Sequence, residues 1–313
     1  MTQLQQIGVE VIYGRDSVTH FEELGKYFDV VIFHTQSTAE YMDPVKAHFQ
    51  KARIIFDTSD LHYLRLQREG ETTGDQEALR KAKEYKRKEL LMAQKSDVVF
   101  VVSEDEKDFL MRETAGKANG RIEVVPNVHQ VSPTSTLFEQ RRGLMFIGAF
   151  SHAPNRDAVV YFLKEIFPEV LKKLDVNFYV IGNNPPDSVL GFQGPNVIFT
   201  GYVPDVTPYY EKCRLMVAPL RYGAGVKGKL TESMSLGLPF VTTSVGAEGM
   251  DLVDRRHCFI ADDPGGFSDK LIRLYDDREL WETFRANSLK LALERFSYET
   301  VKKRLETFFS EGR

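Results

Sequence analysis

Residues 223–239 read GAGVKGKLTESMSLGLP, in which three glycines and two lysines precede a run with helical character. An apolar run at 215–218, typical of a buried strand, comes before it. The helical part ends at Gly237, and Pro239 follows as a usual stop signal. Residues 225–227 are therefore predicted to lie at a helix N-terminus, where free backbone N–H groups and the helix dipole favour an anion.

The lysines of this stretch predict the kind of anion. Lys227 and Lys229 add positive charge that can balance a diphosphate without a metal. The glycine spacing also matches the start of a P-loop, but Leu230 stands where that motif needs Ser or Thr to hold Mg²⁺. Glu232, one turn further on, suits the hydroxyls of a ribose. The alternative interpretation is a glycine-rich turn followed by a solvated amphipathic helix.

Length and composition exclude several classes of protein. The chain has 313 residues, enough for two domains, and its net charge of −4 argues against nucleic-acid binding by bulk charge. Its two cysteines, Cys213 and Cys258, form no zinc or disulfide pattern and fit a reducing compartment. We find no run of the roughly 20 apolar residues that a membrane span needs, and no signal peptide. The prediction is a cytoplasmic protein.

Strands and amphipathic helices alternate along nearly the whole chain, which predicts an α/β fold with parallel sheets. A polar segment at 127–142 reads as a linker between two halves. A helix is expected over 157–174. The predicted strands are 9–13, 29–34, 53–57, 98–102, 122–125, 144–147, 177–181, 197–200, 215–218, 240–243 and 258–260.

The stretch PLRYGAGVKGKLTESMSLGLPFVTTSVGAEGM resembles the donor-binding segment of the retaining glycosyltransferases of family four, which have the GT-B fold. Further matching pieces are VEVIYG, DVVIFH, IIFDTSDLHYLRLQRE, SDVVFVVSEDE, IEVVPNV, FIGAFSHAPNRDAV, VIFTGYVPDVTPYYEKCRLMVAPL and RFSYETV.

This resemblance implies two Rossmann-like domains with parallel sheets facing a central cleft. Residues 1–130 would form the acceptor-side domain, 143–295 the donor domain, and 296–313 a helix packing back toward the first domain. The donor would be a nucleotide diphosphate sugar, with UDP favoured, and the acceptor a saccharide or glycolipid of cell-envelope polysaccharide synthesis. No cofactor or metal would be needed, because the lysines balance the diphosphate and the chain carries no Asp-x-Asp pair at a strand end.

The resemblance also assigns residues to roles. Gly225, Val226 and Lys227 would face the diphosphate, Glu232 the ribose and Val203 the base. Many relatives carry a second glutamate that touches the transferred sugar, and Ala224 occupies its position here.

Two histidines are further candidates. His62 is the candidate catalytic residue, because it stands where relatives often place a histidine that contacts the donor sugar and helps catalysis, although a lone histidine is more often a surface or packing residue. Asp60 could orient it, but the favoured interpretation is a cap for the next helix. His152 stands near the position of a basic residue that faces the diphosphate in relatives. The alternative there is a turn before a helix capped by Asn155.

Three further predictions concern the first half. It starts later than its relatives, so we expect it to lack a first strand and to leave a sheet edge that favours self-association or a partner chain. SEDE, residues 103–106, reads as a helix capping box rather than a metal site. The basic helix at 78–94 could draw the protein to anionic lipid, although such charge runs are usually solvated.

Two rival functions stay open. A non-catalytic nucleotide-sugar-binding module, or a fragment of a larger glycosyltransferase, would keep the donor side without transfer. A nicotinamide-dependent oxidoreductase would need G-x-G-x-x-G after an early strand, and FIGAFSHAPN supplies only Gly148.

Overall fold

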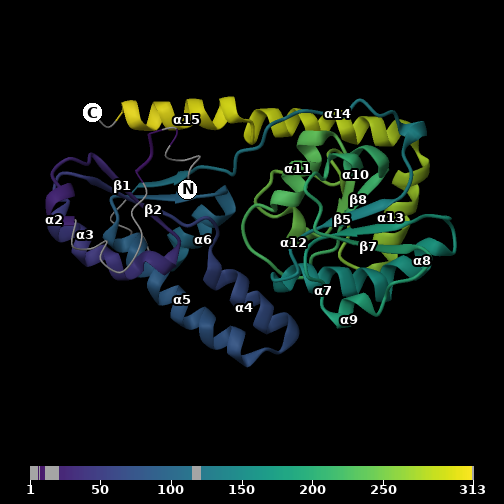
Figure 1. Ribbon diagram of the computed structural model, residues 1–313, viewed down its shortest axis with the longest axis horizontal. Coiled ribbons are helices and arrows are strands. Elements are labelled where there is room, and N and C mark those ends of the chain that lie inside the picture. The colour runs from purple at the N-terminus through teal and green to yellow at the C-terminus, as the bar shows by residue number, and fades with distance from the viewer. Residues whose placement is uncertain (1–5, 7, 11–20, 115–120, 312–313) are drawn as a thin grey trace.

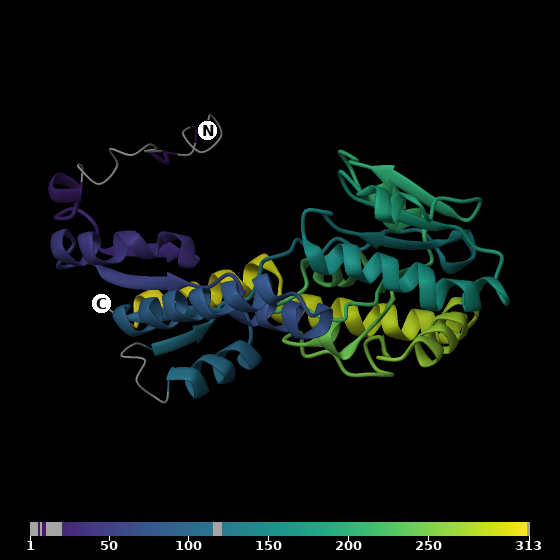
Figure 2. The same ribbon diagram turned by 90° about the horizontal axis from the view of Figure 1, so that it is seen from below.

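Two parallel sheets organise the chain, one in each half of the sequence (Figure 1). This computed structural model describes all residues except 1–5, 7, 11–20, 115–120 and 312–313. Figure 2 shows the two domains from below, with the yellow C-terminal helices running across both. The predicted α/β fold with two parallel sheets is confirmed.

The first domain has four described strands in the order β1-β2-β3-β4, all parallel. β2 and β3 are buried apolar runs, which explains why the sequence predicts them well. The predicted strand 9–13 falls largely outside the described residues. The elements are α2 (Phe21–Leu24), β1 (Val30–His34), η2 (Gln36–Tyr41), α3 (Met42–His48), β2 (Arg53–Asp57), α4 (His62–Thr73), α5 (Gln76–Lys95), β3 (Val98–Val101), α6 (Glu104–Thr114) and β4 (Arg121–Val124).

The second domain has six described strands in the order β10-β9-β8-β5-β6-β7, again parallel. Its elements are η3 (Phe138–Gln140), β5 (Leu144–Ile147), α7 (Ala153–Tyr161), the π-helix η4 (Phe162–Ile166), α8 (Phe167–Leu171), β6 (Phe178–Ile181), α9 (Asp187–Leu190), β7 (Val197–Gly201), α10 (Thr207–Lys212), β8 (Leu215–Ala218), α11 (Gly228–Leu236), β9 (Phe240–Thr242), α12 (Ser244–Ala247), β10 (Phe259–Ile260), α13 (Pro264–Asp276) and α14 (Arg278–Arg295).

The helix expected over 157–174 has different bounds and is not uniform. Helical structure begins at Ala153 and widens into a π-helix at η4 before α8 ends at Leu171. Pro168 lies in the first turn of α8 and has no N–H to donate to the preceding turn. The proline therefore gives a physical reason for the wider π-turn beside it, which the apolar stripe alone does not reveal.

The segment predicted as a polar linker is partly built into the second domain. The N–H of Ser132 donates to the carbonyl of Ser235 at 3.0 Å. The guanidinium of Arg141 is fully buried and donates to the carbonyl of Cys213 at 3.1 Å. Burial lowers the pKa of Arg141 to about 10. The final residues of this segment thus belong to the second domain rather than to a free linker.

The last helix, α15 (Tyr298–Ser310), returns to the first domain and lies along its sheet (Figure 1). Phe308 packs edge-on against Phe100 of β3, with ring centroids 5.3 Å apart, beside Ile55 and Val98. The guanidinium of Arg304 donates to the carbonyl of Val124 at 2.6 Å. Across the described parts of the chain, we find no helix that is both long and apolar enough to cross a membrane.

Candidate functional site

Strand order determines where a site can form in the second domain. The order reverses between β5 and β8, which are neighbours although far apart in sequence. Loops that follow two such strands diverge and leave a crevice at their carboxyl ends. The loop after β5 carries His152, and the loop after β8 leads into the glycine–lysine stretch. Both loops line a single open pocket of about 410 Å³.

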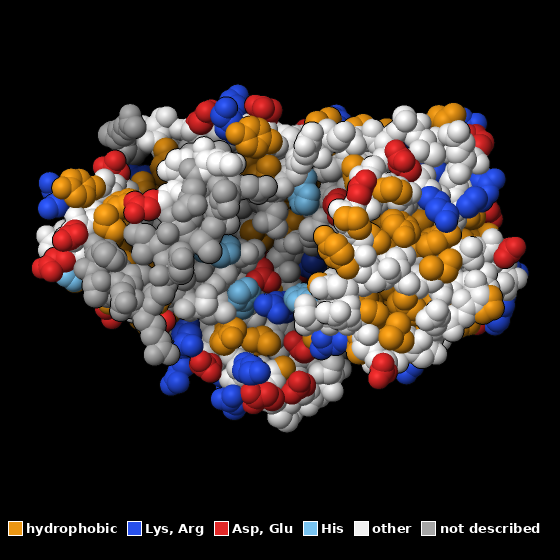
Figure 3. Space-filling view, viewed as in Figure 1, with side chains coloured by type: hydrophobic (Ala, Val, Ile, Leu, Met, Phe, Trp, Pro, Cys, Tyr) orange, Lys and Arg blue, Asp and Glu red, His pale blue; other side chains and the backbone are white. Residues whose placement is uncertain are grey.

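The first domain forms the opposite wall of this pocket, through the segment that follows β2. In the space-filling view, histidine side chains gather around the hollow between the two domains, beside both acidic and basic groups (Figure 3). The residues that line the pocket are Ser59, Asp60, His62, Arg65, Asn127, His152, Pro154, Asn155, Leu220, Tyr222, Gly223, Ala224, Val226, Lys227, Gly228 and Lys229.

The glycine–lysine stretch opens helix α11, which starts at Gly228 with Lys227 as its N-cap residue. No side chain caps it, so the N-terminal N–H groups of this helix have no such acceptor in the described structure. Gly225 has a φ of 64°, and a Cβ there would lie 2.9 Å from the Cβ of Asp60. Glycine is thus needed both for the turn and for the close approach of the two domains.

The two lysines of this stretch are held in place by hydrogen bonds, and Lys229 is half-buried. Lys227 is buried, and its Nζ donates to the carbonyl of Gly225 at 2.5 Å. Lys229 donates to Oδ1 of Asn155 at 2.5 Å and lies 4.0 Å from the centre of the Phe146 ring. Burial lowers the pKa of Lys227 to about 8, and burial with the charge of Lys227 lowers that of Lys229 to about 7. An anion in this pocket would restore the charge on both.

His152 lies at the start of α7, at the same end of the pocket as Lys229. Burial, followed by the charges of Arg65 and Lys229, lowers the pKa of His152 to about 4. Its imidazole is therefore neutral near pH 7 and can offer one N–H donor but no positive charge. The Asn155 side chain does not cap α7; it accepts from Lys229 and donates to the carbonyl of Ala149 at 2.8 Å.

Asp60 does not cap the next helix, so that interpretation of the sequence is wrong. Helix α4 begins after Leu61 without a side-chain cap. Asp60 instead pairs its Oδ1 with Nε2 of His62 at 2.7 Å and its Oδ2 with Nε of Arg65 at 3.3 Å. Burial alone would raise the pKa of Asp60, but its hydrogen bond to His62 and the neighbouring charges lower it overall. Nδ1 of His62 lies 2.5 Å from Oε1 of Gln36, so both ring nitrogens are held.

Two buried carboxylates explain why Asp60 is free to face the pocket. Glu106 accepts from the N–H of Leu61 at 2.9 Å, and Glu89 accepts from the N–H groups of His62 at 3.0 Å and Tyr63 at 3.3 Å. They satisfy the first N–H groups of α4 from other helices. Burial raises the pKa of Glu106 to about 7 and that of Glu89 to about 8. The buried capping role of Glu89 is hard to predict from the sequence, because Glu89 belongs to a strongly charged helix.

Of the capping box predicted for residues 103–106, the serine cap is confirmed and the reciprocal bond of the glutamate is not present. The N–H of Glu106 donates to Oγ of Ser103 at 3.2 Å, as a capping residue requires. The second bond of a capping box would run from the Ser103 N–H back to the Glu106 carboxylate. That carboxylate instead accepts from Leu61 and from Val102, the latter at 3.4 Å.

Glu232 and Val203 lie outside the set of residues that line the pocket. Glu232 is half-buried one turn into α11 and accepts from the Tyr210 hydroxyl at 3.1 Å. Burial raises the pKa of Glu232, and this hydrogen bond opposes the change. Val203 packs beside the core that contains Leu230. Their roles beside a ribose and a base stay predictions.

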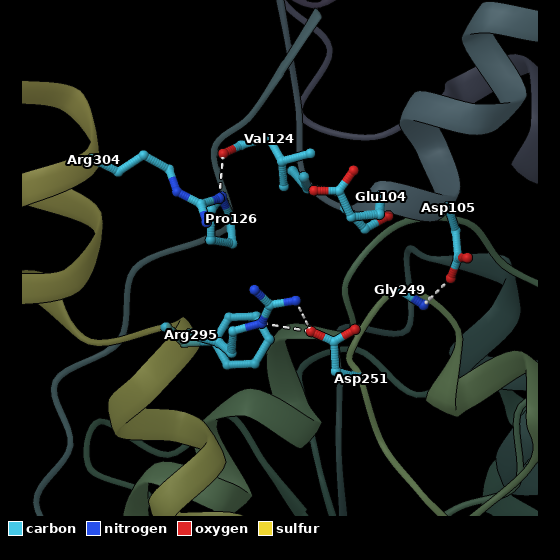
Figure 4. Close-up of a pocket in the computed structure, with 11 residues that line it drawn as sticks. Glu104, Asp105, Val124, Pro126, Gly249, Asp251, Arg295 and Arg304 are labelled. Atoms are coloured by element: carbon cyan, nitrogen blue, oxygen red, sulfur yellow. Dashed lines mark hydrogen bonds and ion pairs between the residues drawn. The ribbon is translucent and has the colours of Figure 1, made fainter. Parts of the chain in front are cut away.

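The two domains also touch beside the pocket. The Arg68 guanidinium donates to the Glu248 carboxylate at 2.5 and 2.7 Å and to the carbonyl of Gly223 at 2.8 Å. A smaller cavity of about 50 Å³ lies between Asp105, Gly249, Asp251 and the junction of α14 with α15 (Figure 4). Asp105 accepts there from the N–H of Gly249 at 2.8 Å. These contacts hold the loops that contain Gly223 and residues 248–249 against the first domain.

Comparisons with known proteins agree with this arrangement. Residues 141–277 match the family model described as glycosyl transferases group 1. The capsular polysaccharide biosynthesis glycosyltransferase CapM of Staphylococcus aureus is 25% identical over 165 residues, which are 50% of this chain and 43% of that protein. The chain therefore spans less than half the length of this curated relative.

Solved structures share the fold at low sequence identity. Sucrose-phosphate synthase from Thermosynechococcus elongatus superposes with a TM-score of 0.76 at 14% identity, covering 96% of this chain and 80% of that one. Anabaena Alr3699/HepE in complex with UDP and glucose superposes with a TM-score of 0.70 at 16% identity, covering 99% and 88%. The predicted GT-B-like fold is confirmed, and the comparisons support a relationship to group 1 glycosyl transferases.

Proposed function

We propose that this protein is a glycosyltransferase that moves a sugar from a nucleotide diphosphate donor, UDP-type favoured, to a saccharide or lipid-linked acceptor. One observation carries the proposal: a single pocket joins the uncapped start of α11, Lys227 and Lys229 to His62 and Asp60 of the other domain. The match of residues 141–277 to glycosyl transferases supports it. Polysaccharide synthesis as the setting rests on the likeness to CapM.

The proposed reaction retains the configuration at the anomeric carbon and uses no divalent metal. The N–H groups of α11 and the two lysines would stabilise the negative charge that develops on the leaving diphosphate. His62 is held at Nε2 by Asp60 and at Nδ1 by Gln36, and it would exchange the Gln36 contact for a hydroxyl of the transferred sugar. The acceptor hydroxyl would enter on the face that the diphosphate leaves, so positioning and electrostatic stabilisation would supply most of the acceleration.

A thermal-shift panel in EDTA tests this proposal directly. UDP-, GDP-, ADP- and dTDP-sugars are compared, because a ligand that binds the folded state alone raises the apparent stability. We expect one nucleotide class to raise Tm without metal, and NMR of the product to show a retained anomeric configuration. Binding that needs a divalent cation would contradict the metal-free site. Binding without transfer or donor hydrolysis would favour the non-catalytic module.

Diphosphate binding is expected to take up protons from solution. At pH 8 the pKa values of about 7 for Lys229 and about 8 for Lys227 leave much of each amine uncharged. A bound anion raises both pKa values, so uptake should be on the order of one proton per UDP. Calorimetry in two buffers of different ionisation enthalpy measures it. Lys229→Met should take up fewer protons than wild type, whereas exposed Lys173→Met should not differ; equal uptake in all three would contradict the assignment.

Two predicted associations concern surfaces of the first domain outside the pocket. Among the described residues, none pairs with the outer edge of β1, where Ile32 is 53% exposed. Self-association through this edge stays a prediction, and analytical ultracentrifugation tests it.

Helix α5 has exposed basic side chains at Lys83 and Arg87. Peripheral binding of this helix to anionic vesicles stays a prediction, and a flotation experiment tests it.

A further inference from the structure

The pocket is poorly supplied with permanent positive charge from the second domain. Lys227 and Lys229 have lowered pKa values, and His152 is neutral near pH 7. A diphosphate ester carries two negative charges, and protonating the two lysines to pair with them uses part of the binding free energy, whereas a group that is already charged needs no such step. Among the described residues that line the pocket, Arg65 is the one arginine. A guanidinium keeps its charge throughout the physiological pH range.

Arg65 comes from the first domain, one turn after His62 on helix α4. Residues three apart on a helix lie on the same face, so both reach the pocket. The Arg65 side chain is 21% exposed, and its Nε donates to Oδ2 of Asp60. Asp60 therefore holds His62 with one oxygen and Arg65 with the other.

Most of the donors on Arg65 are unused. A guanidinium has five N–H donors, and Nε supplies one of them to Asp60. Its two terminal nitrogens have no hydrogen-bond partner among the described residues. Arg68, one turn further along α4, is the contrast, because Glu248 and Gly223 occupy both of its terminal nitrogens. Arg68 fastens the domains together, while Arg65 presents free donors to the pocket.

We propose that Arg65 binds the sugar-bearing phosphate of the nucleotide diphosphate donor, reaching it from the first domain. The inference rests on the proposed function and adds a residue that the glycine–lysine stretch does not supply. His62 is proposed to contact the transferred sugar, and Arg65 shares Asp60 with it, so we assign Arg65 to the sugar end of the diphosphate rather than to the nucleoside end. The leaving phosphate is then held by both domains at once. Binding of the phosphate therefore favours close contact between the two domains.

Calorimetry with UDP, UMP and uridine on the full chain tests this assignment. Arg65→Gln is expected to weaken UDP about tenfold, because charge-assisted contacts to the second phosphate are lost. UMP and uridine, which lack that phosphate, should bind as they do to wild type. Arg65→Lys should recover part of the loss, because it restores charge without the planar fork. Exposed Arg87→Gln removes the same charge from the same domain and should leave all three affinities unchanged.

The possible results separate this inference from the proposed function. Wild-type binding of UDP with unchanged UDP affinity in Arg65→Gln would overturn the role of Arg65 alone. Equal weakening of UDP, UMP and uridine would overturn it too, because that pattern indicates a general distortion. If Arg65→Gln does not fold, Arg65→Lys carries the same comparison. A wild-type chain that binds no nucleoside diphosphate would contradict the proposed function and this assignment together.

Discussion

Replacing Lys227 by alanine is expected to weaken UDP binding by roughly 1.5–3 kcal/mol, the range for a lost hydrogen bond to a charged group. Lys227 is the N-cap residue of α11 and is buried beside the pocket. Uridine, which has no phosphate, should lose little affinity. Calorimetry with both ligands measures the difference, and exposed Lys173→Ala serves as the charge-matched control in the same domain.

Removing the charge of Lys227 is expected to weaken ligand binding but not to lower the stability of the fold. Burial lowers the pKa of Lys227 from 10.5 to about 8, so protonating it in the folded protein is less favourable than in the unfolded chain. Below pH 8 this lowers stability, and stability recovers as pH rises from about 8 toward 10.5. Lys227→Met, which keeps an unbranched side chain one atom shorter and removes the charge, should therefore melt at or above the wild-type temperature at pH 7. Unchanged UDP affinity in either variant would contradict the anion site.

Phe308→Ala is expected to destabilise the protein by about 3–5 kcal/mol, the usual range for truncating a buried aromatic side chain. Phe308 is 6% exposed and packs on Phe100 against the face of the first sheet. Its neighbour Phe309 is 36% exposed, so Phe309→Ala should change stability by less than about 1 kcal/mol. Urea denaturation, together with hydrogen exchange of the amides in β2 and β3, measures the effect. Equal losses in the two variants would show that α15 does not stabilise the sheet as described.

Much of the fold could be predicted from local sequence. Strands β2, β5 and β8 have the predicted bounds because buried parallel strands are continuous apolar runs between polar turns. Helix α11 could also be predicted, because the glycines before it and the stop signal after it lie next to it in the sequence. The break at Pro168 was missed because an apolar stripe continues through it.

The first-domain side of the site was harder to predict, because it depends on contacts between distant segments. Asp60 faces the pocket because Glu89 and Glu106, from two other helices, satisfy the start of α4. No spacing within residues 57–65 shows this. The role of Arg65 could not be predicted for the same reason, because it depends on the place of Arg65 in one pocket with Lys227 and Lys229 of the other domain. Arg141 stands in a polar segment, and its burial could not be predicted because two of its acceptors, the carbonyls of Tyr210 and Cys213, lie 69 and 72 residues further along the chain.

The return of α15 to the first domain has a consequence for synthesis on the ribosome. The residues of β2 and β3 are translated early, but the side chain that covers Ile55, Val98 and Phe100 is Phe308, near the other end of the sequence. At usual rates of elongation, Phe308 is synthesised on the order of ten to forty seconds after β3, and this apolar face stays exposed until then. During that interval the nascent first domain presents a surface that chaperones or other nascent chains can bind. Slowing translation before codon 298 should therefore increase aggregation through the first domain, while the second domain, whose buried core lies between residues 138 and 296, should be less affected.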